Sequence, residues 1–324
     1  MPINSLLGFE DFLVLDSADY YLLDNPDLPN TIILTDHLGG FDSNYSNRLF
    51  DKLKKPYTII TQMKLDEKVQ SRYPHLDLVY SHVINEQITH THFDGYQGGP
   101  ELNYKNFVCS FNGWPHVGRQ LLVSALNKFG YYNKFYTSKN HAVAGNQIDG
   151  HISTLSDNAR FDLKFFDCTD SFNNKENSFG WVQYDHKNNI YNLEKKLTES
   201  FLHIVSETMS TSYCPFITEK VFYSVVTKGL FLAYGQPNWH AYFKTAYGFK
   251  LYNNLFDYRF DSIRNPVSRL IELLTMISKF SRLTPFEWHD LYLLELENIE
   301  YNYDHYRSKD YLNNLKMLDN TSNV

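Results

Sequence analysis

The sequence contains few cysteines and no cysteine pair at the spacing of a metal or redox motif. Its three cysteines, Cys109, Cys168 and Cys214, lie far apart and are odd in number. A disulfide framework needs paired cysteines, and a structural zinc site needs closely spaced ligands. The histidines of THTHFD, His90 and His92, share a face on a strand, but no third ligand follows at metal spacing. We therefore expect neither disulfides nor a bound metal.

Long apolar runs are also missing. No stretch approaches the roughly 18 apolar residues needed to span a bilayer. The first residues, MPINSLLGFEDF, have neither a basic n-region nor a long apolar core, which is unlike a secretory signal peptide. The expected compartment is the cytoplasm, with no membrane span.

Positive charge is scarce as well. The formal net charge is −7, whereas a protein that wraps duplex nucleic acid usually has a basic excess to displace counterions from phosphates. The sequence also has no GxSxG, Walker A or HExxH segment, so the hydrolase classes that these motifs mark lack support. Nucleic acid is therefore a disfavoured partner.

The first third of the sequence has the alternation of an α/β fold. At 324 residues and 43% apolar composition, the chain is long enough for two α/β domains. Short continuous apolar runs predict buried strands of a parallel sheet. They are FLVL (12–15), TIILT (31–35), YTIIT (57–61) and LDLVYS (76–81), and helix-compatible segments such as SNRLFDKLKK (46–55) separate them.

A second strand–helix series follows. NFVCSF (106–111) predicts a strand and VGRQLLVSALNKFG (117–130) an amphipathic helix that ends at a glycine. Further on, SFLHIVSE (200–207) predicts a strand, ITEKVFYSVVTKG (217–229) a helix and LFLAYG (230–235) the next strand. The series indicates a second α/β domain.

The chain is expected to divide into three parts. The Gly-rich polar stretch 90–105 is typical of an interdomain linker. We therefore predict an N-terminal domain over 1–103, a second domain over 104–284 and a helical C-terminal segment over 285–324, with helix already beginning at Pro266.

The first candidate site lies where the predicted strand 200–207 leads into the predicted helix 217–229. A buried strand ends at Glu207 and Thr208, and after a loop a helix begins with Thr218, Glu219 and Lys220. Ligands of open α/β sheets bind beyond the carboxyl ends of the strands, and a helix N-terminus there suits a phosphate. The same residues also fit an ordinary helix cap, and the two interpretations remain open from the local pattern.

A second candidate lies in CSFNGWPHVGRQLL (109–122), where Arg119 falls in the first turn of a helix. Arginine offers a rigid fork of donors that can bind two diphosphate oxygens. Residues 104–150 hold five basic residues against one acid, a local balance of +4, which suits a polyanionic ligand. A solvated helix face explains the lysines equally well. These residues are Lys105, Arg119, Lys128, Lys134 and Lys139, with Asp149.

Together these segments resemble the donor-binding motif of the α1,3-fucosyltransferases. The resemblance rests on a strand ending in S-E-T, a loop, P-F-I-T-E-K, a helix and L-F-L-A-Y-G-Q-P, preceded by N-F-V-C-S-F-N-G-W-P-H-V-G-R. It covers about 106–128 and 200–240 and extends to viral and bacterial glycosyltransferases with the same T-E-K arrangement. The strand end reads S-E-T instead of E-N-S and the loop is longer, so the resemblance leaves the sugar and the base open.

The resemblance implies a GT-B architecture, in which two Rossmann-like domains face across a cleft, and inverting transfer without a metal. It implies that Arg119 and Lys220 neutralise the diphosphate of a nucleotide-sugar and that Glu219 holds the ribose. The implied donor-binding set is Arg119, Glu207, Thr208, Thr218, Glu219 and Lys220. The nucleotide-sugar is a co-substrate, and no further cofactor is expected.

The resemblance also implies a general base in the N-terminal domain, in the loop after the second strand. Asp36 in TIILTDHLGG occupies that position and is the predicted catalytic residue. Other acids of that domain remain rivals: Asp42, Glu86, Asp94 and Glu101.

The expected function is transfer of a sugar to an acceptor hydroxyl, with a glycan or glycoconjugate as the expected acceptor. Two alternatives stay open at this point. One is a viral glycosyltransferase that modifies a DNA base, and the other is a non-catalytic nucleotide- or sugar-binding module.

Overall fold

The computed structural model describes residues 13–15, 27–34, 50–61, 71–81, 93, 95–98, 102–112, 117–128, 135–138, 186–207, 215 and 217–322. The chain divides into two compact units. The first comprises residues 1–88 with 315–324, and the second comprises residues 89–314. Each unit contains one parallel sheet, which confirms the expected α/β class.

The first unit is built on a four-stranded parallel sheet with the strands in chain order. Its described core includes Ile32, Ile59, Ile60 and Phe50, and Phe50 packs edge-on against Tyr73 with ring centroids 5.4 Å apart. All four predicted strands of this region are confirmed. The strands are β1 (Leu13–Leu15), β2 (Thr31–Leu34), β3 (Tyr57–Thr61) and β4 (Leu76–Tyr80).

The second unit has a four-stranded parallel sheet in the order β6-β5-β7-β8. Every residue of β7 and β8 is buried, which explains why their apolar residues are continuous instead of alternating. The three strands predicted here are confirmed, and β6 is an addition that the sequence analysis lacked. The strands are β5 (Asn106–Phe111), β6 (Phe135–Ser138), β7 (Ser200–Ser206) and β8 (Leu230–Tyr234).

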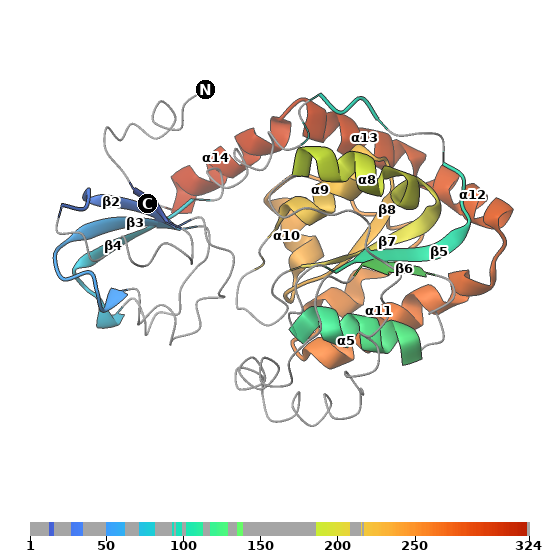
Figure 1. Ribbon diagram of the computed structural model, residues 1–324, viewed down its shortest axis with the longest axis horizontal. Helices are drawn as coiled ribbons and strands as arrows, with labels where there is room; N and C mark the ends of the chain where they lie inside the picture. Colours follow the sequence, from blue (N-terminus) through green and yellow to red (C-terminus); the bar gives the residue numbers. More distant parts are fainter. Residues whose placement is uncertain are drawn as a thin grey trace. The chain divides into compact units, whose positions relative to one another are not determined.

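Helices cover both faces of this second sheet (Figure 1). On one side lie α8, α9 and α13, and on the other lie α5 and α11. The predicted helices at 117–130 and 217–229 are confirmed with shorter ends, whereas α8 and the short α10 were not predicted. The bounds are α5 (Val117–Lys128), α8 (His186–Thr198), α9 (Glu219–Val226), α10 (Trp239–Thr245), α11 (Pro266–Ser278) and α13 (Leu296–Arg307).

The C-terminal segment is helical, as expected, but it forms separate helices. Thr284 and Glu287 close a capping box at the start of α12 (Pro285–Leu294), and α14 (Asp310–Ser322) begins after Lys309, whose φ is 64°. Trp288 of α12 stacks on Phe201 of β7 with centroids 5.8 Å apart, which anchors the helix to the sheet. Residues 285–314 belong to the second unit and 315–324 to the first.

Part of the stretch expected to be a linker packs into the second unit. Phe93 contacts Tyr223 of α9 edge-on at 4.8 Å, and the Tyr96 hydroxyl donates to Glu194 of α8 at 2.7 Å. Both aromatic side chains are buried. Among the described helices, none is long and apolar enough to cross a membrane.

Candidate functional site

The strand order of the second sheet fixes where a ligand can enter. From β5 the chain moves outward to β6, and it then returns to the other side of β5 to form β7. In open parallel sheets such a reversal leaves a crevice beyond the carboxyl ends of the two strands concerned. The crevice expected here lies between the ends of β5 and β7. In the described part of the chain, α5 follows β5 and α9 follows β7.

Glu207 lies at the carboxyl end of β7. Its backbone N–H donates to the carbonyl of Tyr234 at 3.1 Å, so the ladder with β8 holds Glu207 in place. Gly235, after β8, lies against its side chain, because a Cβ there would be 3.2 Å from Glu207 Cγ and 2.7 Å from Trp239 Cδ1. A glycine is therefore required beside Glu207.

The start of α9 is tied to Glu207. Thr218 is the N-cap residue, and its hydroxyl donates to Glu207 Oε2 at 2.5 Å while its backbone N–H donates to Oε1 at 3.3 Å. The same hydroxyl accepts a bond from the backbone N–H of Lys220 at 3.4 Å. Side-chain caps of this kind contribute about 0.5–2 kcal/mol to stability. The helix cap, which was one of the two interpretations of these residues, is therefore present.

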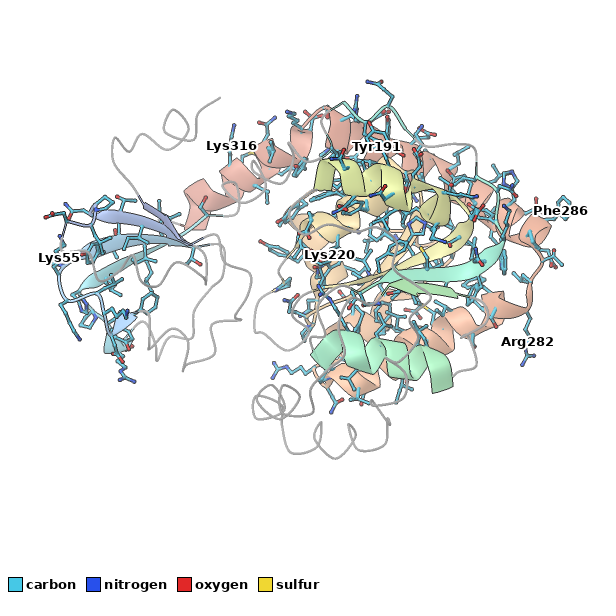
Figure 2. All side chains as sticks on the ribbon, viewed as in Figure 1. Lys55, Tyr191, Lys220, Arg282, Phe286 and Lys316 are labelled. Carbon is cyan, nitrogen blue, oxygen red and sulfur yellow. The ribbon has the colours of Figure 1, made fainter. Side chains whose placement is uncertain are left out.

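Lys220 lies in the first turn of α9, at the end of the sheet (Figure 2). Its Nζ donates to Glu219 Oε1 at 3.0 Å and to Thr218 Oγ1 at 3.2 Å. The side chains of Lys220 and Glu219 are 22% and 17% exposed. They are thus the most accessible charged groups of this cluster, in which Arg119 and Glu207 are buried.

Arg119 occupies the first turn of α5 and is 3% exposed. Burial lowers the pKa of its guanidinium to about 10, while the nearby Glu219 and Glu207 oppose that shift. The group therefore stays positively charged at neutral pH. Its electrostatic interaction with both acids joins the start of α5 to the start of α9.

Glu207 is 1% exposed. Burial raises the pKa of its carboxyl group, and Glu219 adds to the increase, whereas Lys220 and the bonds from Thr218 oppose it. Desolvation favours the neutral form of a buried acid unless cations or donors hold the charge. The four charged groups here are two acids, Glu207 and Glu219, and two bases, Arg119 and Lys220.

Buried polar side chains also lie at the ends of β5 and β7, on the face of the sheet opposite to that of Glu207. The register that pairs Asn106 with Ser200 and Cys109 with His203, continued by three residues, brings Asn112 opposite Ser206. Asn112 Nδ2 donates to Ser110 Oγ at 3.0 Å. The buried hydroxyl of Ser206 makes no hydrogen bond within the described part of the chain. Alternation along the strands puts these side chains on the face covered by α5.

The structure brings together most of the predicted donor-binding residues: Arg119, Glu207, Thr218, Glu219 and Lys220. Thr208 lies outside the described residues, as do Asp36 and its rivals Asp42, Glu86, Asp94 and Glu101. Asn112, Ser206 and the packing role of Gly235 were not predicted from the sequence. The only signal for them was their position directly at strand ends.

The other buried polar groups nearby have structural roles. His240 Nε2 accepts the N–H of Ala233, on the outer side of β8, and its Nδ1 pairs with Asp261 at 2.8 Å. The guanidinium of Arg269 donates to the carbonyls of Gly235 and Ile263. These bonds satisfy backbone groups that the edge strand and the turns after it leave open.

No group of three or more His, Cys, Asp or Glu side chains arranged to hold a metal occurs among the described residues, which do not include His90 and His92. No protein-family model, no curated protein and no solved structure matches the chain. The site is therefore interpreted from its own geometry.

Proposed function

We propose that this protein is a glycosyltransferase that moves a sugar from a nucleoside-diphosphate-sugar to an acceptor hydroxyl, with inversion and without a metal. The observation that carries the proposal is the meeting of Arg119, Glu219 and Lys220, from the starts of two helices, at the carboxyl ends of β5 and β7. This is the position at which open α/β sheets bind nucleotides.

The charges of the site support a diphosphate ligand. Arg119 is a buried, fixed cation, and Lys220 is a cation on a long flexible stem. A bound diphosphate, with its higher negative charge, would draw Lys220 Nζ away from Glu219. The carboxylate of Glu219 would then accept hydrogen bonds from the ribose hydroxyls.

The proposed reaction is a single displacement. The acceptor oxygen attacks the anomeric carbon, the bond from that carbon to the β-phosphate oxygen breaks, and the nucleoside diphosphate leaves. Negative charge grows on the leaving group, and Arg119, Lys220 and the N-terminal dipole of α9 stabilise it. The N–H groups of a helix start and two cations thus take the role that a divalent metal has in other transferases.

A general base must accept the proton of the acceptor hydroxyl as the new bond forms. The sequence-based candidate is Asp36, in the first unit, with Asp42, Glu86, Asp94 and Glu101 as rivals. In the proposed GT-B architecture, the base and the donor site belong to different domains that face across a cleft. The two sheet-bearing units and their boundary near residue 88 are consistent with that proposal.

The expected acceptor is a glycan or glycoconjugate. The net charge of −7 makes a duplex DNA acceptor less favourable, because an acidic protein gains little from counterion release. The nucleotide-sugar is consumed as a co-substrate, so no cofactor is required. We expect the reaction to take place in the cytoplasm.

A thermal-shift screen tests the donor site. GDP, UDP, ADP, CDP and inorganic pyrophosphate are added without divalent cations, and at least one nucleotide should raise the melting temperature. A ligand at 100 times its Kd stabilises the folded state by about 2.7 kcal/mol. Lys220→Ala should remove the shift, whereas Lys250→Ala, which removes a half-exposed lysine paired with Glu297, should retain it.

Two results would reject the proposal. The first is the absence of stabilisation by every nucleotide tested, and the second is an equal shift in Lys220→Ala and in the unmodified protein. Incubation with a panel of nucleotide-sugars then separates a transferase from a binding module. A transferase should release nucleoside diphosphate slowly by hydrolysis even without its acceptor.

A further inference from the structure

We propose that Glu207 is a positioning residue that sets the geometry of Lys220 through Thr218 and does not contact the donor. The inference rests on the proposed donor site and assigns Glu207 a different task from the donor-binding role expected from the sequence. It follows from the contacts of the carboxyl group, its burial and its place between two helix starts.

Both oxygens of the carboxyl group are already bonded within the protein. Oε2 accepts the Thr218 hydroxyl at 2.5 Å, and Oε1 accepts the Thr218 N–H at 3.3 Å. With 1% of the residue exposed and Gly235 packed against Cγ, the group is closed off by its own neighbours. Glu219 and Lys220, in contrast, keep part of their side chains accessible.

The bonds of Glu207 continue directly to a cation of the site. Thr218 Oγ1 uses its hydrogen for Glu207, which leaves its lone pairs for the backbone N–H of Lys220 at 3.4 Å and for Lys220 Nζ at 3.2 Å. The carboxyl group thus fixes the direction of the Thr218 hydroxyl. That direction decides whether the hydroxyl can accept from Lys220.

Glu207 also acts on the second cation. It interacts electrostatically with Arg119, which is buried at the start of α5. A buried guanidinium requires a nearby negative or acceptor group to remain charged. The carboxyl group that orients Lys220 through Thr218 therefore also supplies negative charge near Arg119.

Substitution by glutamine distinguishes positioning from a purely electrostatic effect. Glu207→Gln keeps the size of the side chain but removes its charge, and its amide can donate to Thr218 Oγ1 where the carboxylate accepted. Removal of a negative charge beside a polyanion should by itself tighten binding. Loss of positioning should weaken it. The two explanations therefore predict changes of opposite sign.

The test measures the Kd of inorganic pyrophosphate by calorimetry, without divalent cations, for the full chain and its variants. We expect Glu207→Gln and Thr218→Val to bind at least tenfold more weakly, and Thr218→Ser to recover most of the loss seen in Thr218→Val. The matched control is Glu295→Gln. Glu295 is equally buried and accepts bonds from the Asn254 N–H and from Asn298, away from these residues.

Hydrogen exchange of the amides of residues 217–221 gives a second measurement that needs no ligand. In Glu207→Gln these amides should exchange at least tenfold faster than in the unmodified protein, while in Glu295→Gln they should not. Unchanged or tighter pyrophosphate binding by Glu207→Gln, or unchanged exchange at the start of α9, would overturn the positioning role. If the unmodified protein binds neither pyrophosphate nor any nucleotide, the proposed function fails, and the exchange data still decide the role of Glu207.

Discussion

Arg119, in the first turn of α5, interacts electrostatically with Glu219, the first residue of α9, although one hundred residues separate them in the chain. The interaction exists because β5 and β7 are neighbours in the sheet and their carboxyl ends lie side by side. The two helix starts that follow these strands thereby form one charged cluster. This relationship gives the proposed donor site its two cations.

The first prediction concerns these cations. Arg119→Ala and Lys220→Ala should each lower kcat by about 10²-fold or more, because each removes a group that stabilises the charge of the leaving diphosphate. Turnover is measured as nucleoside diphosphate released from whichever nucleotide-sugar is active. Lys250→Ala provides the control, and circular dichroism confirms that each variant is folded. Near-normal turnover in either site variant would contradict the assignment.

The second prediction concerns the general base. Asp36→Asn should abolish sugar transfer but leave the Kd for the nucleoside diphosphate within about twofold, since a base acts on the acceptor and not on the donor. The corresponding amide variants of Asp42, Glu86, Asp94 and Glu101 serve as comparisons. If one of these, and not Asp36→Asn, loses transfer with intact nucleotide binding, that residue is the base.

The third prediction concerns metals. Because Arg119, Lys220 and the start of α9 are proposed to neutralise the diphosphate, an excess of EDTA should leave the transfer rate unchanged. The measurement compares initial rates before and after chelation, with and without added Mg²⁺. A rate that falls with EDTA and returns with Mg²⁺ would show that the cations of the protein are insufficient.

The fourth prediction concerns packing behind the site. A Cβ at Gly229 would lie 2.1 Å from Cε1 and 2.7 Å from Nδ1 of His203. Gly229→Ala should therefore reduce the free energy of unfolding by about 1–3 kcal/mol, the usual cost of overpacking. In a His203→Ala background the same change should cost less than half as much, since the imidazole is gone. Equal costs in both backgrounds, measured by urea denaturation, would mean that the two residues do not touch.

The fifth prediction concerns pH. Burial lowers the pKa of His203 from 6.5 to about 4, against an opposing effect of its bond to the Leu197 carbonyl. Between these values the unfolded chain binds a proton that the folded protein excludes, so stability falls as the pH drops from 6.5 to 4. The loss attributable to this residue is at most about 3 kcal/mol.

The control for this effect is His203→Gln, which has no titrating group at this position. The difference in unfolding free energy between the two proteins, measured at pH 7, 6, 5 and 4, isolates His203 from carboxyl groups that titrate in both. The unmodified protein should lose its advantage progressively toward pH 4. A difference that is constant over this range would show that His203 is protonated equally in both states.

The sequence by itself determined the strands and the helices that frame the site. Continuous apolar runs such as those of β3, β5 and β7 report burial on both faces of a sheet directly, so their bounds match the prediction almost to the residue. The short β6 and the polar α8 lack such a signal. These elements are stabilised by their contacts with β5 and β7, which a local sequence pattern does not show. The breaks between α12, α13 and α14 likewise depend on caps and on packing against the sheet.

The residue types of the site could also be chosen from the sequence, since Arg119, Glu219 and Lys220 fall in first turns of helices that follow strands. Only the tertiary structure decided that β7 returns beside β5 and so brings these helix starts together. It alone decided that both oxygens of Glu207 are bonded to Thr218. Strand order and hydrogen-bond partners depend on residues that are distant in the chain. A local sequence pattern does not specify which of these residues come together in the fold.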